Sequence, residues 1–117
     1  MARIALKRAF DAPAKEDGYR VLVDGLWPRG VKKEHAHIDE WPKEIAPSRE
    51  LREAFHDGSL GWGEFRKRYL NELTEHRETL RPLAQRAKGE TVTLVFASKE
   101  TRTNNAVVVR QYLNMLG

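Results

Sequence analysis

A short apolar run in this sequence ends at residues whose side chains can do chemistry. Residues 21–23, VLV, are consecutive aliphatic residues, a pattern typical of a strand that is buried on both faces. Asp24 follows them directly, and Trp27 and Arg29 come next in the stretch LWPRG. Ligands of open α/β sheets bind beyond the carboxyl ends of parallel strands. The sequence therefore predicts a ligand site at the end of this strand.

A second group of polar residues follows another apolar segment. Residues 91–97, TVTLVFA, predict a second buried strand of the parallel type, and the polar segment SKETRTNN comes after it. This segment contains Lys99, Asn104 and Asn105 and precedes a helix, whose N-terminus would offer unpaired backbone N–H groups to an anion. We expect the two strand ends to be neighbours and to form one anion-binding site.

Asp24 and Arg29 are the candidate catalytic residues of this site. A carboxylate at a strand end can act as a general base, a metal ligand or a hydrogen-bond acceptor, or it can form a structural ion pair with Arg29 or Lys99. The guanidinium of Arg29 presents a planar fork of donors that suits phosphate or carboxylate. The residue types alone leave these roles of Asp24 open.

Trp27, Lys99, Asn104 and Asn105 are the candidate substrate-binding residues. Trp27 followed by a proline can form a stacking platform for a flat ligand, and a place in the core is the alternative. Lys99 would add a point charge beside an oxyanion, or it is a solvated loop cation. The two asparagines would donate from the helix terminus, although Asn104 is equally well explained as a helix cap.

No metal or cofactor is expected from the sequence. The histidines of HAH at 35–37 are two residues apart in a polar loop, which is not a helical ligand spacing. His56 beside Asp57 is explained by a histidine at a helix end that interacts with the helix dipole. The chain has no cysteine, which excludes thiolate nucleophiles and iron–sulfur clusters, and it contains neither a P-loop nor a dinucleotide fingerprint.

The length and the net charge of the chain limit the classes of protein to which it can belong. The 117 residues predict one domain spanning 1–117. The formal net charge of +4 favours anionic partners, either small molecules or nucleic acid, and is also compatible with an ordinary basic surface. No apolar run is long enough to cross a membrane, so we expect a cytoplasmic protein that does not contact the bilayer. The sequence leaves the oligomeric state open.

The predicted elements give an α/β fold with a small, mostly parallel sheet and flanking helices. A strand is expected at 3–10, and a strand at 20–24 is expected to be the central one. Three helices are expected. The first covers residues 48–56 with Ser48 as N-cap, and the last covers residues 105–116. Between them, residues 62–80 form a helix that is kinked at Pro82 and continues to a left-handed stop at Gly89. The intervening loop 25–47 is long for a compact domain, which marks it as part of a site.

Several motifs occur in a recognisable order along nearly the whole chain: VLVDGLWPRGVKKE, HIDEW, IAPSRELR, FRKRYLNEL and VTLVFASKETRTNNAVVVRQYL. Their combination resembles the YeaO-like branch of the domain-of-unknown-function family 488. The resemblance implies an α/β fold in a bacterial or archaeal cytoplasmic protein and implies no established activity. The chain departs from the family pattern at Gly25, where members usually have Arg, and at Thr103, where they often have His. A catalytic scheme that uses either group therefore lacks that group in this chain.

Three functions follow from these patterns. The first is a protein, either an enzyme or a binder, that holds an anionic, phosphate-bearing or nucleotide-like small molecule in a pocket at the C-terminal ends of the strands. The alternative is a non-catalytic nucleic-acid-binding domain that uses the basic helix 62–77 and the loop 29–33. The third is an adaptor whose long loop recruits a protein partner. The first requires the site residues to converge in one pocket, and the second requires the basic residues to share one face.

Overall fold

Three parallel strands form the sheet of the computed structural model, which describes residues 2–116. The strands are β1 (Ile4–Arg8), β2 (Tyr19–Leu22) and β3 (Val92–Phe96). Their order in the sheet is β1-β3-β2. The predicted α/β fold with a parallel sheet is confirmed, and the first strand, whose direction the sequence left open, is parallel to the others.

The central strand is β3, and the prediction that the strand at 20–24 is central was wrong. Residues 21–23 are nevertheless fully buried, because a segment outside the sheet covers the outer edge of β2. The N–H of Leu22 donates to the carbonyl of Glu40 (3.0 Å), and the carbonyl of Arg20 accepts from the N–H of Asp39 (2.8 Å). An edge strand covered in this way has the same apolar pattern as a central one.

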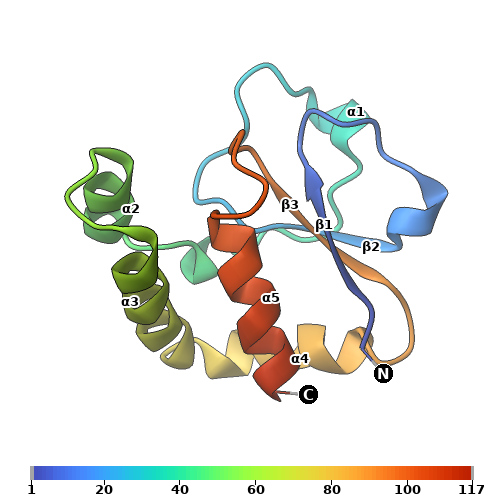
Figure 1. Ribbon diagram of the computed structural model, residues 1–117. Helices are drawn as coiled ribbons and strands as arrows, with labels where there is room; N and C mark the ends of the chain where they lie inside the picture. Colours follow the sequence, from blue (N-terminus) through green and yellow to red (C-terminus); the bar gives the residue numbers. More distant parts are fainter. Residues whose placement is uncertain (1, 117) are drawn as a thin grey trace.

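Helices cover one face of the sheet. They are α2 (Arg49–His56), α3 (Trp62–Thr74), α4 (Arg77–Arg86) and α5 (Asn105–Leu116). In Figure 1, α5 lies over the sheet, with α3 and α4 packed beside it. The core contains Tyr69 and Leu73 of α3, Leu80 of α4 and Leu94 of β3, all fully buried. Within residues 2–116, no helix is long and apolar enough to cross a membrane.

The long helix predicted at 62–80 is interrupted earlier than expected. The break between α3 and α4 falls at residues 75–76, whereas Pro82 lies inside α4. Pro82 is exposed, so water can bond to the carbonyl that its missing N–H leaves open. The break lets Leu73 and Leu80 reach one core from two helices. The left-handed stop at Gly89 was also wrong, because the positive-φ glycines of the described chain lie elsewhere.

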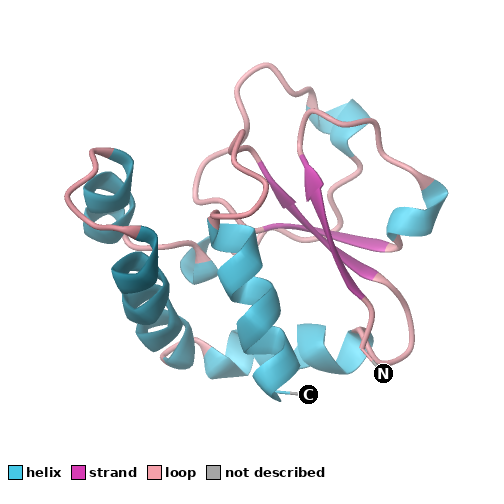
Figure 2. Cartoon of the chain, in the orientation of Figure 1, coloured by secondary structure: helices cyan, strands magenta, loops and turns pink. Residues whose placement is uncertain are grey.

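Loops rather than long helices cover the other face (Figure 2). Residues 27–41, which include the short helix α1 (Lys33–Ala36), pack onto Leu22 and Val95. The rings of Trp27 and Trp41 meet edge to face with their centroids 5.5 Å apart. The indole N–H of Trp27 donates to a backbone oxygen four residues later (2.6 Å). Trp27 therefore belongs to the packing of this face.

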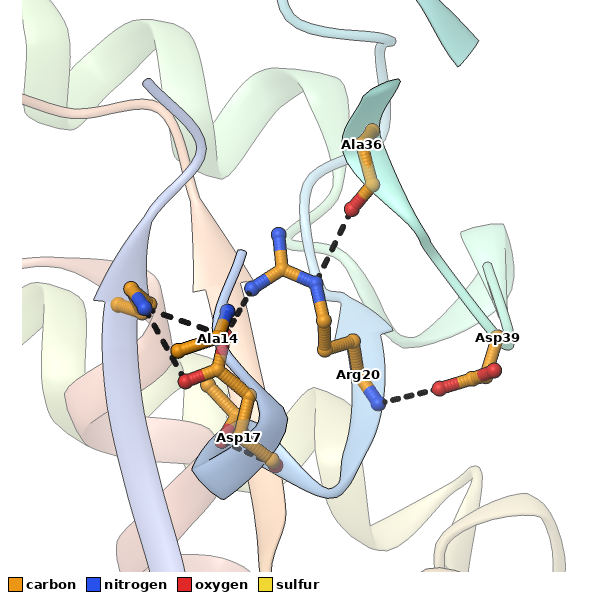
Figure 3. Close-up of polar contacts among 7 residues, drawn as sticks. Ala14, Asp17, Arg20, Ala36 and Asp39 are labelled. Atoms are coloured by element: carbon orange, nitrogen blue, oxygen red, sulfur yellow. Dashed lines mark hydrogen bonds and ion pairs between the residues drawn. The ribbon is translucent and has the colours of Figure 1, made fainter. Parts of the chain in front are cut away.

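A buried charged cluster fixes the turn before β2, η1 (Lys15–Asp17), to the loop-covered face. The Asp17 carboxylate accepts from Nη1 of Arg20 at 2.6 Å, from Nζ of Lys7 at 3.1 Å and from the N–H of Ala14 at 2.9 Å (Figure 3). Nε of Arg20 donates to the carbonyl of Ala36 (3.0 Å). Burial acts to raise the pKa of Asp17, but these hydrogen bonds outweigh it and lower the pKa. The cluster is thus a buried ion-pair network.

Candidate functional site

A cavity of about 660 Å³ opens beyond the C-terminal ends of β2 and β3. Its walls come from the loop after β2, from α2, from the start of α3 and from the segment between β3 and α5. Figure 1 shows the loops after β2 and β3 on the same side of the sheet as the first turn of α5. Small-molecule sites commonly have volumes of about 300–1,000 Å³. The cavity is therefore large enough for a ligand of nucleotide size.

Asp24 joins the two strand ends beside this cavity. Its Oδ2 accepts from the N–H of Ala97, just after β3, and its Oδ1 accepts from Nδ2 of Asn105, both at 2.9 Å. The same Asn105 amide donates to the carbonyl of Val23 (3.2 Å). Burial raises the pKa of Asp24, although the bonds from Asn105 and Ala97 and the charge of Arg52 oppose the rise. Both carboxylate oxygens thus hold β2, β3 and α5 together.

Replacing Asp24 by alanine is expected to lower the free energy of unfolding by about 1–3 kcal/mol, the cost of leaving buried donors unpaired. The variant leaves the Ala97 N–H and the Asn105 amide without their acceptor. Urea unfolding at neutral pH measures the loss. Asp11→Ala is the control, because Asp11 is exposed and its side chain makes no hydrogen bond or ion pair in the described chain. Equal losses in the two variants would contradict the role given to Asp24.

Asn104 acts as the N-cap of α5. Its Oδ1 accepts from the N–H of Val107 (3.1 Å), and its Nδ2 donates to the carbonyl of Glu100 (2.6 Å). The residue is 3% exposed. The Asn104 amide therefore bonds within the protein through both its oxygen and its nitrogen, the contact to Val107 being that of an N-cap.

Of the other predicted site residues, Arg29 and Trp27 line the cavity and Lys99 does not. Arg29 is exposed and lines the cavity, and Trp27 lines it as a half-buried side chain. Lys99 is exposed but is not part of the lining. Its two neighbours, Ser98 and Glu100, line the cavity instead. The N–H of Glu100 donates to Oγ of Ser98 (3.1 Å). The structure thus does not bring Lys99 into the predicted site.

Arg52 and His56 also line the cavity. The sequence analysis did not name Arg52, and it assigned His56 to the end of its helix. They lie one turn apart on α2, and Phe55 between them stacks on Phe65 of α3 with the centroids 4.3 Å apart. Nη1 of Arg52 is 3.6 Å from the point that a Cβ on Gly25 would occupy. Their i, i+4 spacing on a predicted helix could have indicated that the two basic side chains lie on the same face of that helix. What the sequence did not indicate is that this helix borders the strand ends.

The two loop histidines are not placed as metal ligands. His35 lies in α1, and His37 ends that helix in the left-handed conformation with φ of 50°. Within residues 2–116, no group of three or more histidine, aspartate or glutamate side chains could hold a metal ion.

The basic residues of α3 and of the loop 29–33 lie on elements that pack on different faces of the sheet. The apolar side of α3 packs on the helix-covered face of the sheet, whereas Trp27 and Val31, which flank Arg29, pack on the opposite face. Two cations of α3 also have partners: Arg66 donates to Gln111 of α5, and Arg68 pairs with a glutamate one turn away. The predicted basic helix 62–77 is moreover two helices.

The fold and the cavity define a small α/β protein whose parallel sheet has helices on one face, loops on the other and an open cavity at the strand ends. The chain belongs to the DUF488-N3i family, described as the inactive DUF488-N3 subclade, whose profile matches residues 3–116. This finding, together with the similarity to YeaO described next, confirms the predicted YeaO-like membership.

Two relatives cover nearly the whole chain. The chain is 46% identical over 113 residues to Uncharacterized protein YeaO of Escherichia coli, a match that covers 97% of this chain and 98% of YeaO. It is 36% identical over 112 residues to Uncharacterized protein Rv3073c of Mycobacterium tuberculosis, covering 96% of this chain and 94% of that protein. No solved structure matches the chain significantly.

Proposed function

We propose that the protein binds an anionic, phosphate-bearing or nucleotide-like small molecule in this cavity and does not transform it. The observation that carries the proposal is the composition of the wall, which combines aromatic side chains with two arginines and a histidine. Small-molecule sites typically pair an apolar lining with a few polar groups that fix the orientation of the ligand.

Arg52 is the side chain best placed to hold the anion. It lines the cavity, and none of the ion pairs or side-chain hydrogen bonds within residues 2–116 involves it. Its fork of N–H donors can bind two oxygens of a phosphate at once. His56 lies one turn further along α2, and Arg29 lies on the loop after β2. The two arginines therefore reach the cavity from two separate elements.

The aromatic residues favour a ligand with a flat part. Phe55 is half-buried, stacks on the buried Phe65 and lines the cavity from α2, and the half-buried Trp27 lines it from the loop after β2. Aromatic faces bind heterocycles by stacking, and the interaction contributes about 1–3 kcal/mol per base. A phosphate ester of a heterocycle would use both the aromatic and the cationic groups.

Two observations favour binding over catalysis. Asp24, the candidate base, already accepts hydrogen bonds at both carboxylate oxygens, and both donors belong to the protein framework. Thr103 lies in the cavity lining and has no acid–base group in the physiological range. The description of the family as an inactive subclade supports the same reading. We assign Asp24 the role of holding the cavity wall in shape.

Titration calorimetry with AMP tests the proposal. We expect AMP to bind, and we expect Arg52→Gln to weaken the binding at least about tenfold, because a charge-assisted, two-oxygen contact is lost. Arg49→Gln is the matched control, since Arg49 lies on the same helix, outside the cavity, in an exposed pair with Glu53. AMP should be recovered unchanged after incubation. Absence of binding by AMP and by inorganic phosphate, or equal weakening by both variants, would refute the proposal.

A further inference from the structure

The cavity carries charges of both signs that do not pair with each other. Arg29 and Arg52 are its arginines, and Asp24 and Glu100 are its acids. None of the ion pairs within residues 2–116 joins any of these four side chains. Each carboxylate oxygen of Asp24 accepts a hydrogen bond from the framework and the residue is half-buried, whereas Glu100 is exposed and its carboxylate makes no hydrogen bond in the described chain. Glu100 is therefore the more accessible acid of the lining.

Glu100 is exposed, yet its backbone is fixed on both sides. Its N–H donates to Oγ of Ser98, and its carbonyl accepts from Nδ2 of Asn104 at 2.6 Å. Asn104 is in turn the N-cap of α5 and is almost fully buried. The position from which the Glu100 side chain extends is thus set by the first turn of a core helix, so that a ligand has to order only the side chain and not the backbone.

We propose that Glu100 accepts a hydrogen bond from an amino group at the end of the ligand opposite its anion. This inference rests on the proposed function and names the chemical class of the ligand: a phosphate ester of an aminated heterocycle. An acid beside an anion site repels a ligand that carries only negative charge, and it attracts one whose far end donates hydrogen bonds. The anion then faces Arg52 and His56, the ring packs against the aromatic wall, and the amino group faces Glu100.

A matched pair of probes tests the inference: AMP and purine riboside 5′-monophosphate, which lacks only the amino group. We expect the wild-type protein to bind AMP about tenfold more tightly, as the loss of a hydrogen bond to a charged group implies. Glu100→Ala should bring the ratio of the two affinities to about one and leave the affinity for inorganic phosphate unchanged or slightly higher. Glu75→Ala, an exposed acid outside the cavity, should keep the wild-type ratio.

The outcomes separate this inference from the proposed function. Equal affinities of the wild-type protein for the two probes, or an AMP preference that survives in Glu100→Ala, would overturn the inference and leave anion binding intact. Failure of AMP, of purine riboside 5′-monophosphate and of inorganic phosphate to bind would overturn both. Glu100 is exposed, so Glu100→Ala is expected to fold, and urea unfolding of the variant verifies it.

Discussion

Replacing Asp17 by alanine is expected to lower the free energy of unfolding by about 3–5 kcal/mol, the typical cost of removing one partner of a buried ion pair. Asp17 is the acceptor for Lys7 and Arg20, and Arg20 is only 3% exposed. The variant would leave a buried guanidinium without its counter-ion, and water has little access to replace it. Urea unfolding at neutral pH measures the loss.

An exposed ion pair provides the control for this prediction. Arg49 and Glu53 lie one turn apart on α2 with Nε and Oε1 2.9 Å apart, and both side chains are largely exposed. Glu53→Ala should cost at most about 0.5 kcal/mol, because water screens the exposed pair. If Asp17→Ala cost as little as Glu53→Ala, the buried network would not be the stabilising feature that its geometry indicates.

The pH dependence of stability gives a second measure of the same carboxylate. The folded protein lowers the pKa of Asp17 below its ordinary value of 3.8. A carboxylate of this kind contributes stability at pH values above its unfolded pKa and loses that contribution as the pH falls through the folded pKa. Between mildly acidic pH and pH values below 3.8, the wild-type protein should therefore lose more stability than Asp17→Asn. If Asp17→Asn lost as much stability in acid as the wild-type protein, the lowered pKa of Asp17 would not be the source of the acid sensitivity.

The strands and the last helix could be predicted because burial imposes a pattern on their residues. Every residue of β3 is buried, and its apolar run shows this directly. The same pattern led us to place β2 at the centre of the sheet. Residues 39–40 cover its outer edge, so β2 is as buried as a central strand and its residues do not reveal that it lies at the edge. The sequence also gave no sign of the charged cluster. Lys7 stands in an alternating strand and Arg20 at the start of an apolar run, so both resemble solvent-facing positions, whereas the turn that carries Asp17 closes over them.

The location of the candidate site could be predicted from topology, but its composition could not. Parallel strands bring Asp24 and Asn105 together at one edge of the sheet, and the two are hydrogen-bonded as neighbours. Lys99 lies in the segment after β3, whose local hydrogen bonds are not specified by residue types. The place of Arg52 depends on how Phe55 stacks on Phe65. Such contacts between elements are set by packing, and spacing within an element cannot reveal them.

Replacing Gly18 by alanine is expected to lower the free energy of unfolding by about 3 kcal/mol or more, from backbone strain and a steric overlap together. Gly18 has φ of 63° and ψ of −127°, a conformation that residues with a Cβ rarely adopt. A Cβ there would lie 2.3 Å from the carbonyl oxygen of Thr91. That oxygen accepts from the N–H of Tyr19 (2.9 Å), the bond that aligns the start of β2 with β3. The oxygen therefore cannot move away without loosening the strand pairing.

Gly58 separates the two causes of this loss. It has φ of 85°, but a Cβ there would meet nothing within 4 Å. Gly58→Ala should therefore cost about 1–2 kcal/mol, the penalty for the left-handed conformation alone. Urea unfolding of both variants gives the comparison, and the excess for Gly18→Ala contains the overlap with Thr91 and the added backbone strain of the ψ of −127°. Equal costs would mean that the backbone at Thr91 yields freely, and the pairing of β2 with β3 would then not depend on a glycine at this turn.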